Sequence, residues 1–270
     1  MNSMSDRQES QATTKKSDTS LPETKTWTRY LTEFILVFLA VFLGFLAENY
    51  REKISEEKQA KELALDLYDE LLADSIVAHR IMIGRLKKDS ALNRLKNYVL
   101  DSSLQRPSKE YVLNFYRGLM VSPRFYPRDV VLEQLKNSGA LRFKSNEIQY
   151  LIGMLSVAIY NLRTGNNLEL DINHGQLIPF VTRHNDQRFF DWLTQYGSVS
   201  IVDGLKLYEE EKTSAWYHIG NLSEFNRETV SNILGLHRHI HMSTTRGFYA
   251  SYVEVNKKLL AALRKEYRIK

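Results

Sequence analysis

The hydrophobic pattern changes abruptly near the start of the chain, within the stretch FLGFLAENYREK. Leu31 to Ala47 is apolar except at two positions near its beginning, whereas charged side chains predominate from Glu48 onward. A helix over these 17 residues is about 25 Å long at 1.5 Å per residue, close to the thickness of the hydrocarbon core of a bilayer. The pattern therefore predicts a single transmembrane helix.

Aromatic residues flank this segment as they commonly flank membrane spans. Trp27 and Tyr30 precede it and Tyr50 follows it, and such side chains favour the interface between lipid and water. The span and its flanks together occupy residues 27–50, and the lipid bilayer is the first expected partner.

Two other interpretations of the segment fit less well. A cleaved signal peptide needs small residues at the first and third positions before the cut, but a cut after Ala47 puts Phe45 at the third. The core helix of a soluble protein shows a polar stripe every 3.6 residues, and Phe34 to Ala47 has no polar side chain. Ala40, Gly44 and Ala47 also share one face, which allows a second helix to approach closely.

Basic residues near the two ends of the span predict its orientation. Five Lys or Arg side chains precede it and four follow it, and cytoplasmic flanks hold the excess of such residues. We expect a disordered tail at residues 1–26 in the cytoplasm, a span in the inner (cytoplasmic) membrane and the larger domain in the periplasm. The basic residues counted are Arg7, Lys15, Lys16, Lys25 and Arg29 before the span, and Arg51, Lys53, Lys58 and Lys61 after it.

Residues 51–102 predict a long juxtamembrane helix. They hold one glycine, Gly84, no proline and many strong helix formers. An apolar stripe at three-to-four spacing indicates an amphipathic helix whose first half pairs as a coiled coil and whose second half packs on the remaining domain. The stripe consists of Leu63, Leu67, Leu71, Ala78, Ile81, Leu92, Leu95 and Val99.

Residues 103–270 predict a helical bundle, so the fold class is all-α. The expected helices are 109–120 after a Ser108 cap, 127–139 closed by Gly139, a long stretch from Asn146 to His184 capped by Ser145 and kinked near Pro179, 223–241, and 244–267. Residues 197–204 have a composition typical of a strand but are too short and isolated to form a sheet.

Three short motifs occur in order along the chain: Arg-Tyr-Leu-x-Glu-Phe from Arg29, AENYREK from Ala47, and L-x-x-S-G-A-L-R from Leu135 to Arg142. Together they resemble a family of uncharacterised bacterial single-pass membrane proteins, and the resemblance covers most of the chain from Arg29 on. It implies a short amino-terminal tail, one span and a helical domain. That family has no established activity, so the resemblance assigns no catalytic residue.

Composition excludes several classes of function. The chain has no cysteine, which excludes disulfides and thiolate chemistry. Its net charge of +5 is spread thinly, with ten basic and ten acidic residues between positions 48 and 100. No concentrated basic surface of the kind that binds nucleic acid is therefore expected.

Two clusters are candidates for chemistry or binding. His237 and His241 are one turn apart on a predicted helix, as a two-histidine metal site requires, with a third ligand such as His218 or Glu224. A polar helix face that changes charge near neutral pH is the simpler interpretation. The second cluster can bind an anionic ligand or a partner protein, or can brace a turn between helices; it consists of Arg117, Arg124, Phe125, Tyr126 and Arg128.

These observations favour a non-enzymatic, membrane-anchored scaffold or interaction module without a cofactor. We expect it to self-associate as a homo-oligomer and to bind another membrane or envelope protein. The alternatives are a membrane-tethered ligand sensor whose bundle binds a small molecule, and a metal-dependent enzyme that uses His237 and His241.

Overall fold

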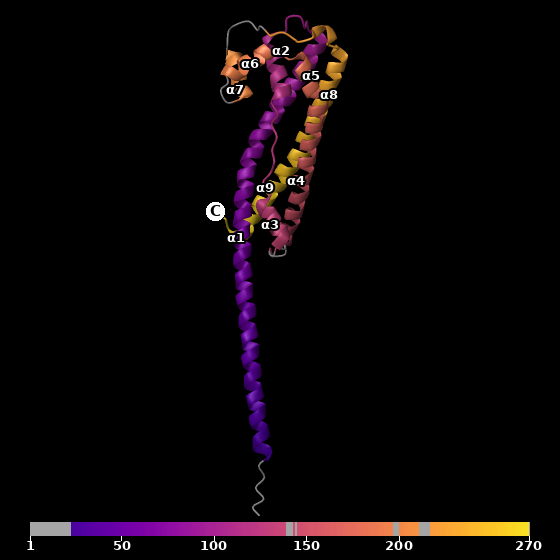
Figure 1. Cartoon of the computed structure of the whole chain (residues 1–270). Helices are drawn as coiled ribbons and strands as arrows, with labels where there is room; N and C mark the ends of the chain where they lie inside the picture. The colour runs from indigo at the N-terminus through magenta and orange to yellow at the C-terminus, as the bar shows by residue number, and fades with distance from the viewer. Residues whose placement is uncertain (1–22, 139–142, 144, 197–199, 211–216, 270) are drawn as a thin grey trace, which may run out of the picture. The chain divides into compact units, whose positions relative to one another are not determined.

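The computed structural model describes residues 23–138, 143, 145–196, 200–210 and 217–269. Every regular element in these residues is helical, which confirms the all-α class. A long first helix, α1 (Glu23–Asp101), is followed by a helical bundle (Figure 1). The chain forms two compact units, Met1–Glu56 and Glu57–Lys270.

The first unit contains the apolar part of α1. This helix includes a window of 18 residues that is long and apolar enough to cross a membrane, and none of the window is buried within the chain. Phe34, Phe38 and Phe42 stack along one face, with ring centroids 6.4 and 6.1 Å apart. The unit therefore presents an entirely exposed apolar surface.

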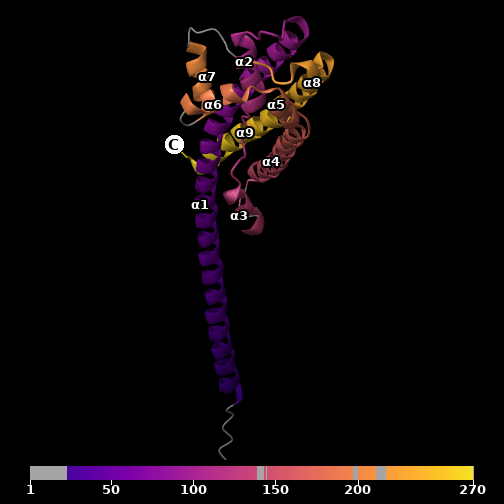
Figure 2. The ribbon, with the colours of Figure 1, turned by 45° about the horizontal axis from the view of Figure 1, so that its top comes forward.

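The second unit contains the rest of α1 and all the later helices. In Figures 1 and 2, α4 lies beside α9, and these two helices contact each other. The helices that follow α1 are α2 (Lys109–Phe115), η1 (Tyr116–Met120), α3 (Val130–Ser138), α4 (Asn146–Ile172), η3 (Asn173–Leu177), α5 (Ile178–His184), α6 (Gln187–Tyr196), α7 (Ile201–Glu210), η4 (Leu222–Glu224), α8 (Arg227–Ser243), η5 (Thr244–Tyr249) and α9 (Ala250–Tyr267).

Local capping chemistry sets several helix starts. The Ser108 side chain accepts a hydrogen bond from the Tyr111 amide, and Ser145 accepts one from the Ile148 amide, so both predicted caps are confirmed. The expected start at residue 223 is wrong. A 3₁₀ turn, η4, occupies that region, and Asn226 caps α8 by accepting from the Thr229 amide.

Two π-helical segments lie where the sequence predicts a kink or a boundary between helices. Pro179 has no N–H to donate to the Gly175 carbonyl, and the preceding residues 173–177 form η3, in which the Ile178 amide donates to the Asn173 carbonyl. Likewise, α8 continues through η5 into α9 instead of ending near residue 241. The stretch expected to resemble a strand begins α7 at Ile201.

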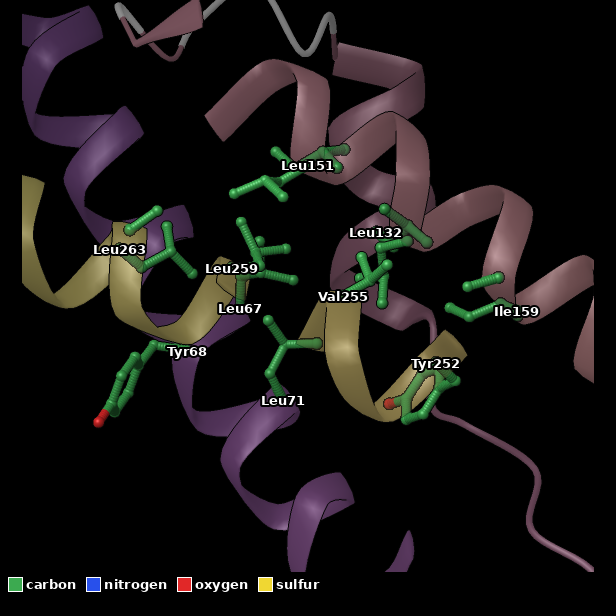
Figure 3. Packing of buried hydrophobic residues seen from close by; sticks show 14 of the residues in the cluster. Leu67, Tyr68, Leu71, Leu132, Leu151, Ile159, Tyr252, Val255, Leu259 and Leu263 are labelled. Atoms are coloured by element: carbon green, nitrogen blue, oxygen red, sulfur yellow. The ribbon is translucent and has the colours of Figure 1, made fainter. Parts of the chain in front are cut away.

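A first hydrophobic core joins α1, α3, α4 and α9. Figure 3 shows Leu67 and Leu71 of α1 pointing toward Val255 and Leu259 of α9. All four side chains are buried, and Leu132 and Leu151 extend the cluster to α3 and α4. The first part of α1 within this unit is therefore held by α9.

A second core surrounds the end of α1. Leu92, Leu95 and Val99 pack against residues of α2, α5, α6, α7 and α8. Aromatic rings dominate this core: Tyr116, Phe189 and Tyr217 contact one another with centroids 5.5 to 6.3 Å apart.

The apolar stripe predicted on α1 thus lies inside the bundle. From Leu63 to Val99 its residues are buried or partly buried against other parts of the same chain. The stripe therefore does not face a second chain over this range, and the coiled-coil prediction fails for these residues. The expected tail before residue 23 and the expected helix end at Gly139 lie outside the described residues, as does the end of the third motif.

Candidate functional site

A cluster of charged side chains lies between the two apolar cores. Arg85 of α1, Glu169 of α4 and His241 of α8 are all buried, with Arg85 and His241 at 0% exposure. Three helices distant in sequence therefore contribute to one polar centre. Burial of this much charge is costly unless each group is paired.

Arg85 is fully hydrogen-bonded. Its guanidinium donates in a bidentate manner to Glu169, once through Nη2 and once through Nη1 at 3.3 Å. The remaining N–H groups donate to Thr245 Oγ1 at 2.7 Å, to the Pro123 carbonyl at 3.2 Å and to the His241 carbonyl at 3.0 Å. All five donors thus have acceptors, and the Tyr249 ring lies 4.4 Å from Cζ.

Glu169 is held as a carboxylate. Burial acts to raise its pKa, but hydrogen bonds from His241 and Arg85 and the charge of Arg85 outweigh burial and lower the pKa to about 2. His241 Nδ1 lies 3.4 Å from Glu169 Oε2, and its Nε2 lies 3.0 Å from the Arg85 carbonyl. Both ring nitrogens therefore lie close to an oxygen atom of the same buried cluster.

Three further basic side chains lie near this cluster. Lys88 of α1 is 2% exposed and His237 of α8 is 1% exposed, while Arg124 in the segment before α3 is half-buried. Both ring nitrogens of His237 and Nε of Arg124 are buried without a hydrogen-bond partner. We call Lys88, Arg124 and His237 the basic triad.

Burial is the main cause of the shifted pKa values of Lys88 and His237. Burial lowers the pKa of Lys88 to about 8, with Glu169 opposing the shift and the charges of Arg124 and Arg85 adding to it. Burial, together with the charge of Lys88, lowers the pKa of His237 to about 3. His237 is therefore a neutral imidazole at pH 7, with one N–H donor and one nitrogen acceptor.

Sequence reasoning missed Arg85, Lys88 and Glu169, although the pattern carries a signal for the first two. Ala78, Arg85 and Leu92 are spaced by seven residues on the buried face of α1, and Lys88 lies seven residues before the buried Leu95. Charged residues that interrupt an apolar stripe mark a buried polar site. The acid that pairs with Arg85 could not be identified in this way, because it belongs to another helix.

The predicted histidine pair does lie on one helix face. The rings of His237 and His241 stack at 6.4 Å between centroids, and His239 is exposed. Among the described residues, no group of three or more His, Cys, Asp or Glu side chains is placed to hold a metal ion. The suggested third ligands make other contacts: the His218 amide donates to Asp186, and Glu224 lies 3.8 Å from Arg183.

The predicted arginine and aromatic cluster is dispersed. Arg117 pairs with Glu209 on the surface, and Arg128 donates to Asp74 at 3.0 Å. Phe125 is buried in the first core, whereas the Tyr126 side chain is 52% exposed. Of the five residues, only Arg124 joins the buried charged cluster in the described chain. The others mainly brace the segment between η1 and α3.

A separate groove of about 710 Å³ lies between α1 and α9. Leu72, Ala78 and Leu260 give it an apolar floor, and Lys257 and Lys265 are among its basic lining residues. It shares no residue with the charged cluster.

Comparison of the chain with models of known protein families, with curated proteins and with solved structures finds no match. Functional inference therefore depends on the geometry of the chain itself.

Proposed function

We propose that the chain is a non-enzymatic scaffold, anchored in a membrane by Leu31 to Ala47, that pairs with a second copy of itself through α1. The observation that carries this proposal is a second apolar stripe on α1, opposite the face that packs in the bundle. We call this stripe the α1 seam; it consists of Leu65, Leu72, Ile76, Ile83 and Leu86, all of them exposed.

The seam has the spacing of a two-stranded coiled coil. Leu65, Leu72 and Leu86 occupy d positions of one heptad frame, and Ile76 and Ile83 occupy its a positions. Leucine at d with isoleucine at a favours parallel dimers. His79 takes the remaining d position between the leucines. A polar residue at one such position fixes register at some cost in stability.

Charges beside the seam suit an in-register parallel pair. Position g of one helix lies near position e of the next heptad on its partner. In this frame, Lys61 meets Asp66 of the second copy, whereas Asp89 already pairs with Arg238 of its own chain. The three other g to e pairs between residues 68 and 87 each contain at least one uncharged residue, so no like charges are opposed at these flanking positions. Asp69 takes the a position between Leu65 and Leu72 and opposes its own copy there, which costs stability at that end of the seam.

The anchor and the groove support the same arrangement. Two copies inserted in one membrane in the same orientation present their α1 helices in parallel. On one flank of the seam, Leu72 and His79 also line the groove between α1 and α9. This hollow gives a second helix room to approach.

The apolar window of α1 supports a lipid anchor. It is exposed throughout, whereas a soluble core helix of this composition is mostly buried. We propose that the anchor lies in the inner membrane, with the bundle in the periplasm. A further membrane or envelope protein remains the proposed partner of the paired bundle.

Single-cysteine crosslinking tests the pairing directly, because the chain contains no cysteine of its own. Ile76→Cys places a thiol at an a position, close to its counterpart in a parallel dimer. Val77→Cys is the matched control, since Val77 is exposed on the adjacent b position. Under mild oxidation in native membranes, the first variant should form a disulfide-linked dimer and the control should stay monomeric. Equal crosslinking of both variants, or monomers only, would contradict the proposal.

A further inference from the structure

We propose that the groove between α1 and α9 binds a long-chain fatty acid, with the acyl chain on its apolar floor and the carboxylate at its basic rim. The groove lies within the second unit of a single chain, so this binding does not require the pairing of α1. It would make the bundle a lipid-binding domain in addition to a scaffold.

The groove has the dimensions of a small-molecule site. Its volume of about 710 Å³ falls within the roughly 300 to 1,000 Å³ that such sites occupy. It follows α1 from Tyr68 to His79, a distance of about 16 Å at 1.5 Å per residue. A docked helix of that length and about 10 Å diameter fills roughly 1,300 Å³, which exceeds the volume of the groove. A single extended acyl chain is therefore the better match.

The floor of the groove is apolar and open to solvent. Leu72 and Ala78 of α1 line it together with Val253, Leu260 and Ala261 of α9. Leu72 is 42% exposed and Val253 is 40% exposed, so apolar surface remains in water after the bundle has folded. A hydrocarbon chain that covers this surface gains free energy from the hydrophobic effect.

Charge complementarity selects an anion. Three cationic side chains line the groove, whereas none of the described residues that line it is Asp or Glu; the cations are Lys257, Arg264 and Lys265. Lys257 and Arg264 lie seven residues apart on α9 and so share one helix face. Arg264 Nη2 donates to Tyr68 Oη at 2.6 Å, which holds the guanidinium at one end of the groove. Cations beside an apolar floor match a carboxylate at the end of an acyl chain.

The groove also borders the α1 seam. Leu72 and His79 line the groove and occupy d positions of the seam, so a bound fatty acid covers part of the surface that a second copy contacts. We therefore expect fatty acid to weaken the pairing of α1. This consequence rests on the proposed function, whereas the binding itself does not.

Photolabelling of the full-length chain in native membranes tests the binding. The probe is a palmitate analogue with a diazirine in its acyl chain, and mass spectrometry of the digested chain locates the label. We expect label on α9 between residues 253 and 265, strong competition by oleate and weaker competition by oleyl alcohol, which lacks the carboxylate. Label confined to residues 27–50 would assign the probe to the bilayer and overturn the proposal. Equal competition by the alcohol would overturn the selection of an anion.

Lys257→Glu and Lys258→Glu provide a matched pair on α9. Both side chains are exposed, but Lys257 lines the groove whereas Lys258 pairs with Glu254 outside it. We expect Lys257→Glu to lower the labelling of α9 by about threefold or more, while Lys258→Glu is labelled as the native chain is. Ala261→Trp, at an exposed position on the floor, should block the groove and abolish labelling. Equal labelling of all three variants would overturn the proposal.

Crosslinking of the Ile76→Cys variant separates this proposal from the pairing of α1. Oleate should lower the yield of the disulfide-linked dimer if the groove and the seam are coupled. Labelling of α9 in a chain that forms no dimer would contradict the pairing and support the binding site. A dimer that forms equally with and without oleate, in a chain whose α9 is not labelled, would overturn the binding site and leave the pairing intact.

Discussion

Replacing Glu169 by Gln tests the buried charged cluster, because the side chain keeps its shape and loses its charge. In the native chain this carboxylate accepts hydrogen bonds from both Arg85 and His241. The amide leaves the Arg85 guanidinium buried without a counterion. We therefore expect a large loss of stability at pH 7.

The pKa of Glu169 gives the size of the expected loss of stability. A carboxyl whose pKa falls from an ordinary 4.5 to about 2 on folding stabilises the native state by about 3 kcal/mol, at 1.36 kcal/mol per pKa unit. Because the folded pKa is the lower one, this contribution is complete above pH 4.5 and is lost as the pH falls toward 2. A second estimate agrees, because removal of one partner from a buried ion pair typically destabilises a protein by about 3 to 5 kcal/mol.

Thermal unfolding followed by circular dichroism at 222 nm measures the effect on the full-length chain in detergent. For a domain of the size of Glu57–Lys270, a loss of about 3 kcal/mol lowers Tm by roughly 6 to 12 °C. Glu254→Gln is the control, since Glu254 pairs with Lys258 on the exposed face of α9 and its loss should leave Tm unchanged. Equal Tm values for the two variants would refute the reasoning. A double variant, Glu169→Gln with Arg85→Met, should lose less stability than the sum of its single changes.

Two further outcomes follow from the packing and charge of the bundle. Gly165→Ala should cost about 1 to 3 kcal/mol of stability, because its new Cβ meets Phe248 at 2.5 Å. Gly153→Ala on the same helix meets nothing within 4 Å and should stabilise the fold by about 0.5 to 1 kcal/mol. Chemical unfolding of the two variants measures both changes, and a loss of stability no larger for Gly165→Ala than for Gly153→Ala would contradict the packing. The folded pKa of His237 is lowered from 6.5 to about 3. The contribution of His237 to folding stability is therefore complete above pH 6.5 and falls by about 3 kcal/mol between pH 6.5 and 4, because the unfolded chain takes up the proton first. His237→Gln should flatten this decline, and an unchanged slope would count against a buried neutral imidazole.

Local chemistry predicted much of the architecture. The helix-rich composition of residues 51–102 indicated a long helix, and Ser108 and Ser145 marked helix starts that the structure confirms. The sequence predicted separate helices at 223–241 and 244–267, but Thr244 and Thr245 donate their hydroxyls to the carbonyls of residues 240 and 241. Their polar groups are satisfied inside a continuous helical segment, so no break is needed.

The hydrophobic pattern of the sequence could not show which distant segments pack against each other. The stripe on α1 predicted a buried face correctly, but periodicity does not say whether a face packs on the same chain or on a second one. Leu67 and Leu71 contact α9, almost two hundred residues later in the sequence. The same limit applies to the candidate site, since His241 was identified on its own helix while Arg85 and Glu169 became visible only when three helices met.

Alkaline carbonate extraction of native membranes, followed by ultracentrifugation without detergent, tests the central claim that lipid surrounds the apolar part of α1. We predict that the full-length chain remains in the membrane pellet. A Leu39→Arg and Leu43→Arg double variant should move to the supernatant, because each arginine costs about 2.5 to 3.5 kcal/mol at the centre of a span. Recovery of the native chain in the supernatant would contradict the account.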